Sequence, residues 1–273
     1  MKNLLFGLMA TLMFSFFGFG KSVAIQLDPS NSKNKYDYVG VMHNKGLESF
    51  INNYKKIDGL ESNKKMSFTT LINANTLYLG QDNSINQFNA LLIKNNSLFA
   101  YLKSIGNSNS TFITAFDAID FKPSNGFKEI YIQMLNSVDE INFKDDTSLN
   151  TYVETIKTIE DNILESSLKT NEKEILLATA SVARYSCCYW FYNTSIASWN
   201  PQKMDTPKMP NIIKWDIAAG AGGGVTGAII GGTVTIPAGG IGAVPGWVAG
   251  AITGAVGGSV SEAVFEFLDW IFG

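Results

Sequence analysis

Apolar residues recur at steps of three and four along most of the chain after residue 36, the spacing that lines one face of an α-helix. Leu47, Phe50, Ile51 and Tyr54 follow this spacing and predict a helix over 36–57. The same pattern predicts helices over 67–80, 85–105, 149–168 and 172–199, with shorter helices around 112–116 and 130–141. Before residue 200 we find no convincing alternation of apolar and polar residues of the kind that half-buried strands require. The pattern therefore predicts an all-α fold.

Three prolines, Pro201, Pro207 and Pro210, fall within ten residues and interrupt this periodicity. Proline breaks a helix interior and disfavours helix in the residue before it. We therefore expect a Pro-rich linker over 200–211. It would separate a helical domain, 36–199, from a C-terminal module, 212–273.

The C-terminal module contains a long uncharged stretch, because no charged residue occurs between Asp216 and Glu262. Two apolar segments, 217–235 and 243–260, flank a glycine- and proline-containing turn at 237–240. Glycine recurs at every fourth position of both segments, at Gly223, Gly227, Gly231, Gly242, Gly246, Gly250, Gly254 and Gly258. A step of four places these glycines on one helix face, where two backbones can approach closely. The pattern predicts a glycine-zipper helical hairpin.

Two environments are compatible with this hairpin. Each glycine in a helix interior costs about 1 kcal/mol relative to alanine in water, so neighbouring helices or lipid must compensate. The hairpin either inserts into a membrane, where the backbone must satisfy its own hydrogen bonds, or stays buried in a soluble helical bundle. Residues 262–272 predict a short amphipathic helix, and we expect three tryptophans at an interface: Trp215, Trp247 and Trp270.

The N-terminus has the three parts of a Sec-type signal peptide. Lys2 supplies the positive charge, residues 4–19 are apolar, and Ser22-Val23-Ala24 is a small-residue cleavage pattern. We expect residues 1–24 to be removed, with an uncleaved N-terminal anchor as the alternative, and 25–35 to form a mobile leader. The predicted location is outside the cytoplasm: secreted, periplasmic or associated with the envelope.

Charge and candidate chemistry argue against several functions. The net charge is −3 and no basic stripe is present, so nucleic acid is not an expected partner. His43 is the only histidine, and the acidic pairs Asp145-Asp146 and Glu160-Asp161 are expected on solvated faces. No nucleotide, calcium or hydrolase motif occurs in the chain. We therefore predict a protein that is not an enzyme, with no catalytic residues, metal site or cofactor.

The second half of the predicted 172–199 helix contains two adjacent cysteines and many aromatic residues. Cys187 and Cys188 have no metal-ligand spacing to other residues, and we expect two small buried side chains. A vicinal disulfide or an intermolecular bridge is the alternative. The aromatic residues either pack in the core or form an interfacial surface for a membrane or partner.

The repeated G-x-x-x-G motif from Gly242 to Gly258 resembles the class II bacteriocins, whose short helices pair through glycines in a target membrane. An uncharged hairpin after a helical domain also resembles, more loosely, the hydrophobic hairpin of pore-forming colicins. The Sec-type signal departs from both families, and the large helical domain departs from the class II bacteriocins. The resemblance implies an exported membrane-active protein whose partner is a lipid bilayer, or the chain itself through the zipper. The alternative is a non-catalytic structural or interaction protein of the cell envelope.

Overall fold

The described residues of this chain are mostly helical. The computed structural model describes residues 27–53, 100–101, 104, 108–119, 121–140, 145–193, 208–231, 235–237, 243–256 and 258. The all-α prediction is confirmed for these residues. Other predictions lie outside them: the signal peptide, the helix at 67–80, most of the helix at 85–105, Gly242, and the C-terminal helix with Trp270.

The described helices range from 5 to 24 residues in length. The labelled elements are α2 (Tyr38–Asn53), α6 (Asn109–Thr114), the 3₁₀ helix η2 (Ala115–Ile119), α7 (Asn125–Asp139), α8 (Asp146–Glu165), α9 (Thr170–Asn193), α10 (Lys208–Gly231), β1 (Thr235–Pro237) and β2 (Ala243–Pro245). A further helix covers 246–256. Side chains cap three of the helices: Ser108, Ser124 and Asp145 accept hydrogen bonds from free backbone N–H groups of α6, α7 and α8.

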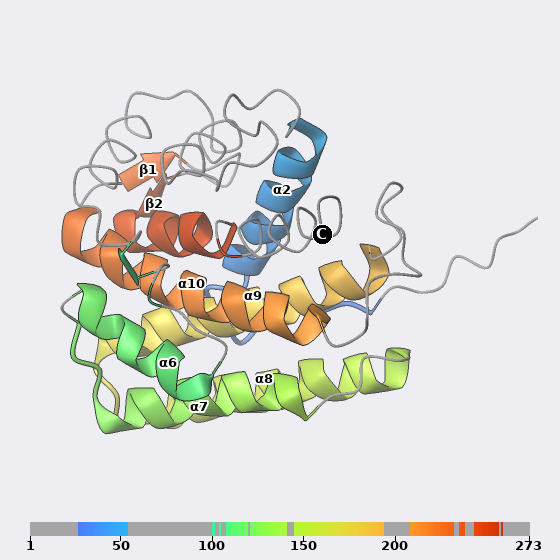
Figure 1. Cartoon of the computed structure of the whole chain (residues 1–273), viewed down its shortest axis with the longest axis horizontal. Coiled ribbons are helices and arrows are strands. Elements are labelled where there is room, and N and C mark those ends of the chain that lie inside the picture. Colours follow the sequence, from blue (N-terminus) through green and yellow to red (C-terminus); the bar gives the residue numbers. More distant parts are fainter. Residues whose placement is uncertain are drawn as a thin grey trace, which may run out of the picture.

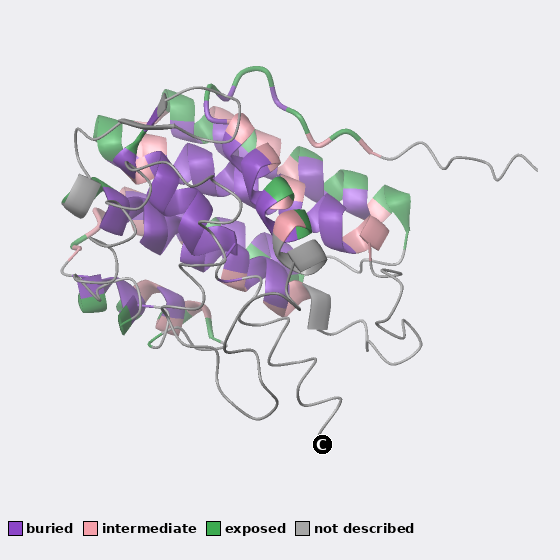
Figure 2. Cartoon of the chain, turned by 90° about the horizontal axis from the view of Figure 1, so that it is seen from above, coloured by how far each residue is buried: buried purple, intermediate pink, exposed green. Residues whose placement is uncertain are grey.

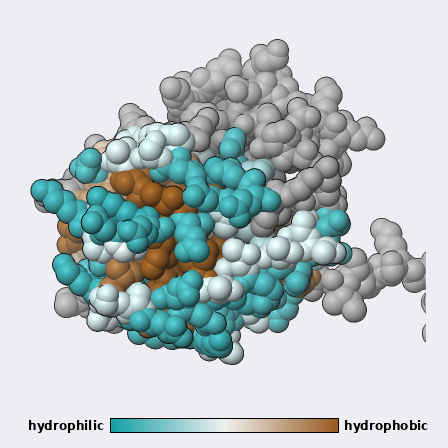
Figure 3. Space-filling view, turned by 90° about the horizontal axis from the view of Figure 1, so that it is seen from below, coloured by the Kyte–Doolittle hydropathy of each residue, from teal (hydrophilic) through white to brown (hydrophobic). Residues whose placement is uncertain are grey.

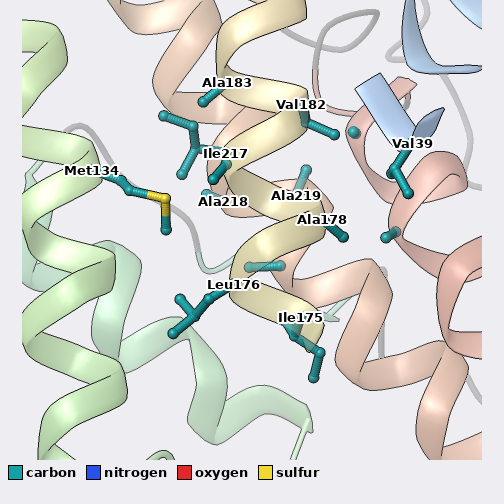
Figure 4. Packing of buried hydrophobic residues seen from close by; sticks show 14 of the residues in the cluster. Val39, Met134, Ile175, Leu176, Ala178, Val182, Ala183, Ile217, Ala218 and Ala219 are labelled. Carbon is teal, nitrogen blue, oxygen red and sulfur yellow. The ribbon is translucent and has the colours of Figure 1, made fainter. Parts of the chain in front are cut away.

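The central helix is α9, and α2, α8 and α10 all pack against it (Figure 1). Every residue of α9 from Ile175 to Trp190 is buried except Tyr185. Figure 4 shows Met134 of α7 on one side of α9 and Val39 of α2 on the other. A helix that neighbouring helices cover on all sides has small or apolar side chains around its whole circumference. This explains the alanines, serines and threonines of α9.

The aromatic half of α9 contributes to this core. Tyr189 and Trp190 are buried, whereas Phe191 and Tyr192 are partly buried and pack against the core. In Figure 2 the buried residues form a continuous interior across the helices. Hydrophilic side chains separate the apolar areas on the face drawn in Figure 3. Among the described residues, Leu164 and Ile229 are the exposed large hydrophobic side chains.

Two element boundaries differ from the predictions. α10 begins at Lys208, inside the predicted linker, with Pro210 in its first turn. Proline is tolerated there, because first-turn N–H groups have no partner within the helix. The second arm of the hairpin was expected to be helical from Ala243, but 243–245 form β2, which pairs antiparallel with β1. Pro245 explains this difference, because proline disfavours helix in the residue before it.

Candidate functional site

α10 and the 246–256 helix lie against each other through their glycines. A Cβ added at Gly223 would overlap the carbonyl of Gly250, and one added at Gly250 would overlap the carbonyl of Gly223. The contact continues in both directions: Gly227 meets the carbonyl of Gly246, and Gly254 meets that of Ala219. We call this antiparallel contact the glycine seam; its residues are Ala219, Gly223, Gly227, Gly246, Gly250, Gly254 and Gly258.

The remaining glycines of the first arm have other surroundings. Gly224 is off the seam, and a Cβ there would lie 3.6 Å from the side chains of Ala251 and Ile175, an ordinary contact distance. Gly222 lies against the ring of Tyr101, whose hydroxyl donates to the carbonyl of Ala218 at 2.8 Å. Gly231 is the last residue of α10, and its surroundings lie outside the described residues.

Two of the three predicted interfacial tryptophans are described, and both are partly buried against the core. The ring of Trp247 meets the ring of Tyr36 edge-on, with 4.8 Å between centroids. Trp215 lies in α10 one turn before Ala219, and its carbonyl oxygen lies against Gly258 of the seam. Among the described residues, no helix has both the length and the apolar character needed to cross a bilayer.

Charged residues fix the start of α10. Lys214 pairs with Asp139 of α7 at 2.6 Å, and the Lys214 side chain is almost fully buried. Asp216, the last charge before the uncharged stretch, is fully buried. Its carboxylate accepts a hydrogen bond from the hydroxyl of Ser186 and lies 3.6 Å from Nε2 of His43. These contacts tie the first arm of the hairpin to α7, α9 and α2.

His43, the only histidine of the chain, takes part in this contact. The imidazole is fully buried between α2 and α10. Burial lowers the pKa of His43 to about 4, because the charged form would lose its hydration, while the contact with Asn44 acts weakly in the opposite direction. Ser186 donates to Asp216, and all three side chains are buried, so the cluster forms a polar contact inside the core.

This lowered pKa predicts acid sensitivity. The ordinary value is 6.5, so the neutral imidazole stabilises the fold above pH 6.5, and this contribution is lost as the pH falls towards 4. We expect the wild type to lose about 2 kcal/mol more than His43→Gln between pH 7 and pH 4.5, because the unfolded chain binds a proton in this range that the buried imidazole does not bind. Urea unfolding at several pH values measures this difference; parallel curves for the two proteins would contradict it.

A second polar cluster surrounds Arg184, which the sequence patterns did not single out. The guanidinium of Arg184 is fully buried in α9 and pairs with Glu160 of α8 at 2.9 Å and with Asp37. Glu160 was expected on a solvated face, and this expectation is wrong because the side chain is fully buried. One signal was present in the sequence: Arg184 is the only charged residue between Glu174 and Lys203. An isolated charge in such a stretch indicates a buried partner.

The chain that precedes α2 completes this cluster. The side-chain amides of Asn31 and Asn34 each donate to Glu160 at 2.6 Å, and both asparagines are buried. Within the segment 25–35, which we expect to be a mobile leader, the described residues from Leu27 onwards form turns that contact α8 and α9.

Cys187 and Cys188 are buried, free thiols. Burial raises the pKa of both thiols, that of Cys188 to about 12. Neither thiol therefore has the reactivity of an exposed thiolate at neutral pH.

Comparisons of the chain with protein-family models, with curated proteins and with solved structures found no match.

Proposed function

We propose that the chain is an exported, non-catalytic protein that stores a preassembled glycine-seamed hairpin in a helical bundle and acts on a lipid bilayer when the hairpin is released. The observation that carries this proposal is the glycine seam. Its two helices contact each other backbone to backbone, as the mutual overlap of Gly223 and Gly250 with each other's carbonyls indicates. The hairpin is thus a unit whose main internal contact does not involve the bundle.

The forces in the seam do not depend on water. Close packing and weak Cα–H···O contacts hold glycine-paired helices together in lipid, where there is no hydrophobic effect between helices. The hydroxyls of Thr226 and Thr253 donate to carbonyls of their own helices, Gly222 and Ala249, at 2.9 and 2.7 Å. Such internal satisfaction of polar groups is what a hydrocarbon environment demands.

The outward faces of the hairpin are apolar. Four apolar side chains of the hairpin are buried within the bundle: Val225, Val248, Ile252 and Val256. On release of the hairpin, these side chains would contact lipid instead of the bundle. The resemblance of the glycine pattern to class II bacteriocins, and more loosely of the hairpin to that of pore-forming colicins, supports the same action.

A second candidate function is that of a structural or interaction protein whose hairpin never leaves the bundle. The charged contacts at the start of α10 favour it: Lys214 with Asp139, and the buried Asp216 beside His43. Moving Asp216 into lipid would be costly, so release of the first arm has to leave this residue near the membrane surface.

A pair of lysine substitutions separates the two candidates. Ile229 of α10 is 57% exposed and Leu164 of α8 is 40% exposed, so a lysine at either position is compatible with the fold. A lysine within a membrane-inserted segment costs roughly 2.5–3.5 kcal/mol at the bilayer centre. We expect the chain without residues 1–24 to release dye from phosphatidylcholine–phosphatidylglycerol vesicles, and Ile229→Lys to reduce this release at least about tenfold.

Leu164→Lys is the matched control and should release dye like the wild type, because α8 is not part of the hairpin. Circular dichroism and thermal unfolding would show that both variants fold. If the wild type neither releases dye nor floats with vesicles, the membrane proposal fails and the second candidate replaces it.

A further inference from the structure

A polar segment before α2 holds that helix in place. We call residues 27–37 the N-terminal strap; Figure 2 draws it as a non-helical tube with buried and exposed stretches. Arg184 joins it at two points, donating to the carbonyl of Pro29 and pairing with Asp37. Asp37 also accepts a hydrogen bond from the hydroxyl of Tyr185 at 2.9 Å. Asn34 donates to the carbonyl of Leu177 at 2.8 Å, in addition to Glu160.

The strap and α2 also contact both arms of the hairpin. The last turn of the strap carries Tyr36, whose ring packs on Trp247 of the second arm. His43 of α2 lies 3.6 Å from Asp216 of the first arm. Between these two points, Gly40 lies so close to α9 that an added Cβ would be 2.6 Å from the carbonyl of Ser181.

From these contacts we infer that the N-terminal strap is a latch that keeps the hairpin in the bundle, with Arg184 as the residue that locks it. The inference rests on the proposed release of the hairpin and names the contact that controls it. Undocking the strap frees α2, and freeing α2 uncovers Trp247 and Asp216, one on each side of the seam.

The chemistry of the cluster makes the latch two-state. Glu160 and Arg184 are fully buried, and the strap supplies the amides of Asn31 and Asn34 that complete the hydrogen bonds of Glu160. A buried ion pair is stable only when its remaining hydrogen-bonding groups are satisfied. A half-docked strap would leave these groups unsatisfied, so the strap is either fully docked or fully released.

Asp37→Asn opens the latch with little change elsewhere. The substitution removes the charge that the strap offers to Arg184, but Glu160 still balances the guanidinium, so no lone charge is left in the core. We expect hydrogen exchange at neutral pH to accelerate about tenfold or more in the segments 38–53, 212–227 and 246–256, the factor that loss of one charged hydrogen bond corresponds to. Exchange in α7 and α8 should stay as in the wild type.

Asp161→Asn is the matched control. Asp161 also pairs with the strap, through Lys33 at 2.8 Å, but both side chains are exposed, and such pairs contribute little. It should leave exchange in the hairpin unchanged. Unchanged hairpin exchange in Asp37→Asn, or equal acceleration in α7 and α8, would overturn the latch.

A reversible cross-link between the strap and α8, which we call the staple, tests the latch in its closed state. This test does not depend on a variant in which a contact of the strap has been removed. In Lys33→Cys/Asp161→Cys, a short thiol-reactive cross-linker that reductant cleaves would join the strap to α8. The stapled protein should exchange more slowly in the hairpin and release no dye from the vesicles, and reductant should restore both. Dye release that the staple does not affect overturns the latch but not the membrane function. If hydrogen exchange in the hairpin changes as expected for Asp37→Asn and for the stapled protein, but no variant releases dye, the membrane function alone is overturned.

Discussion

Gly250→Ala is expected to lower the free energy of unfolding by about 3 kcal/mol, even though alanine is the better helix former. The added methyl group would overlap the carbonyl of Gly223 and lie 2.8 Å from the Cα of Gly227. These atoms belong to a helix backbone and cannot rotate away as a side chain would. The two helices must therefore move apart along the whole seam, which weakens every other close contact in it. Urea unfolding followed by circular dichroism measures the loss.

Gly224→Ala is the matched control on the same hairpin. An added Cβ there meets its nearest atoms at 3.6 Å, so it fits without any movement. The better helix propensity of alanine should then raise the free energy of unfolding by about 1 kcal/mol. If the free energy of unfolding falls for Gly250→Ala and rises for Gly224→Ala, the seam is present in solution. Equal effects of Gly250→Ala and Gly224→Ala would mean that α10 and the 246–256 helix do not meet as described.

The helices of this fold were largely predictable because their spacing is a local property of the chain. Tyr152, Val153, Ile156 and Ile159 lie on one face of α8 at the expected steps, and all four are buried. The ends of elements were harder to predict, since they depend on single residues. Pro210 was taken as a helix breaker although it lies in the first turn of α10, whereas Pro245 does delay the second arm.

The seam and the polar clusters were predictable to different degrees. Glycine at every fourth position of a helix indicates that another helix backbone packs closely against it. In the structure, Gly223 and Gly227 of α10 do meet Gly250 and Gly254 of the second arm. The partners of a buried charge leave no such periodic trace. Arg184 meets Asp37 and Glu160 across 147 and 24 residues of sequence, and these pairings arise only when the N-terminal strap and α8 pack against α9.

Arg184→Met is expected to destabilise the protein by about 3–5 kcal/mol. Methionine fills much of the space of the arginine side chain, so the effect comes from charge and not from a cavity. Without the guanidinium, Glu160 keeps only the amides of Asn31 and Asn34 as described partners and remains a buried carboxylate with no opposite charge. Removing one partner of a buried pair leaves the full desolvation cost of the other uncompensated. Chemical unfolding of the two proteins at pH 7 measures the difference.

The double variant Arg184→Met/Glu160→Gln separates this electrostatic cost from loss of packing. Glutamine is uncharged and its carbonyl oxygen can still accept from one of the two asparagines, so about half or more of the lost stability should return, which makes the double variant more stable than the single one. A double variant that is less stable than Arg184→Met would show that Glu160 is stabilised by its other contacts alone.

Asp37, the second carboxylate that pairs with Arg184, provides a comparison with Glu160. It keeps 21% of its side chain exposed and can stay hydrated when Arg184 is lost, so adding Asp37→Asn to Arg184→Met should cost little further stability. Glu160 has no such access to water, and this difference in burial makes the pair of Arg184 with Glu160 the stronger determinant of the fold, while the pair with Asp37 remains the one that can open.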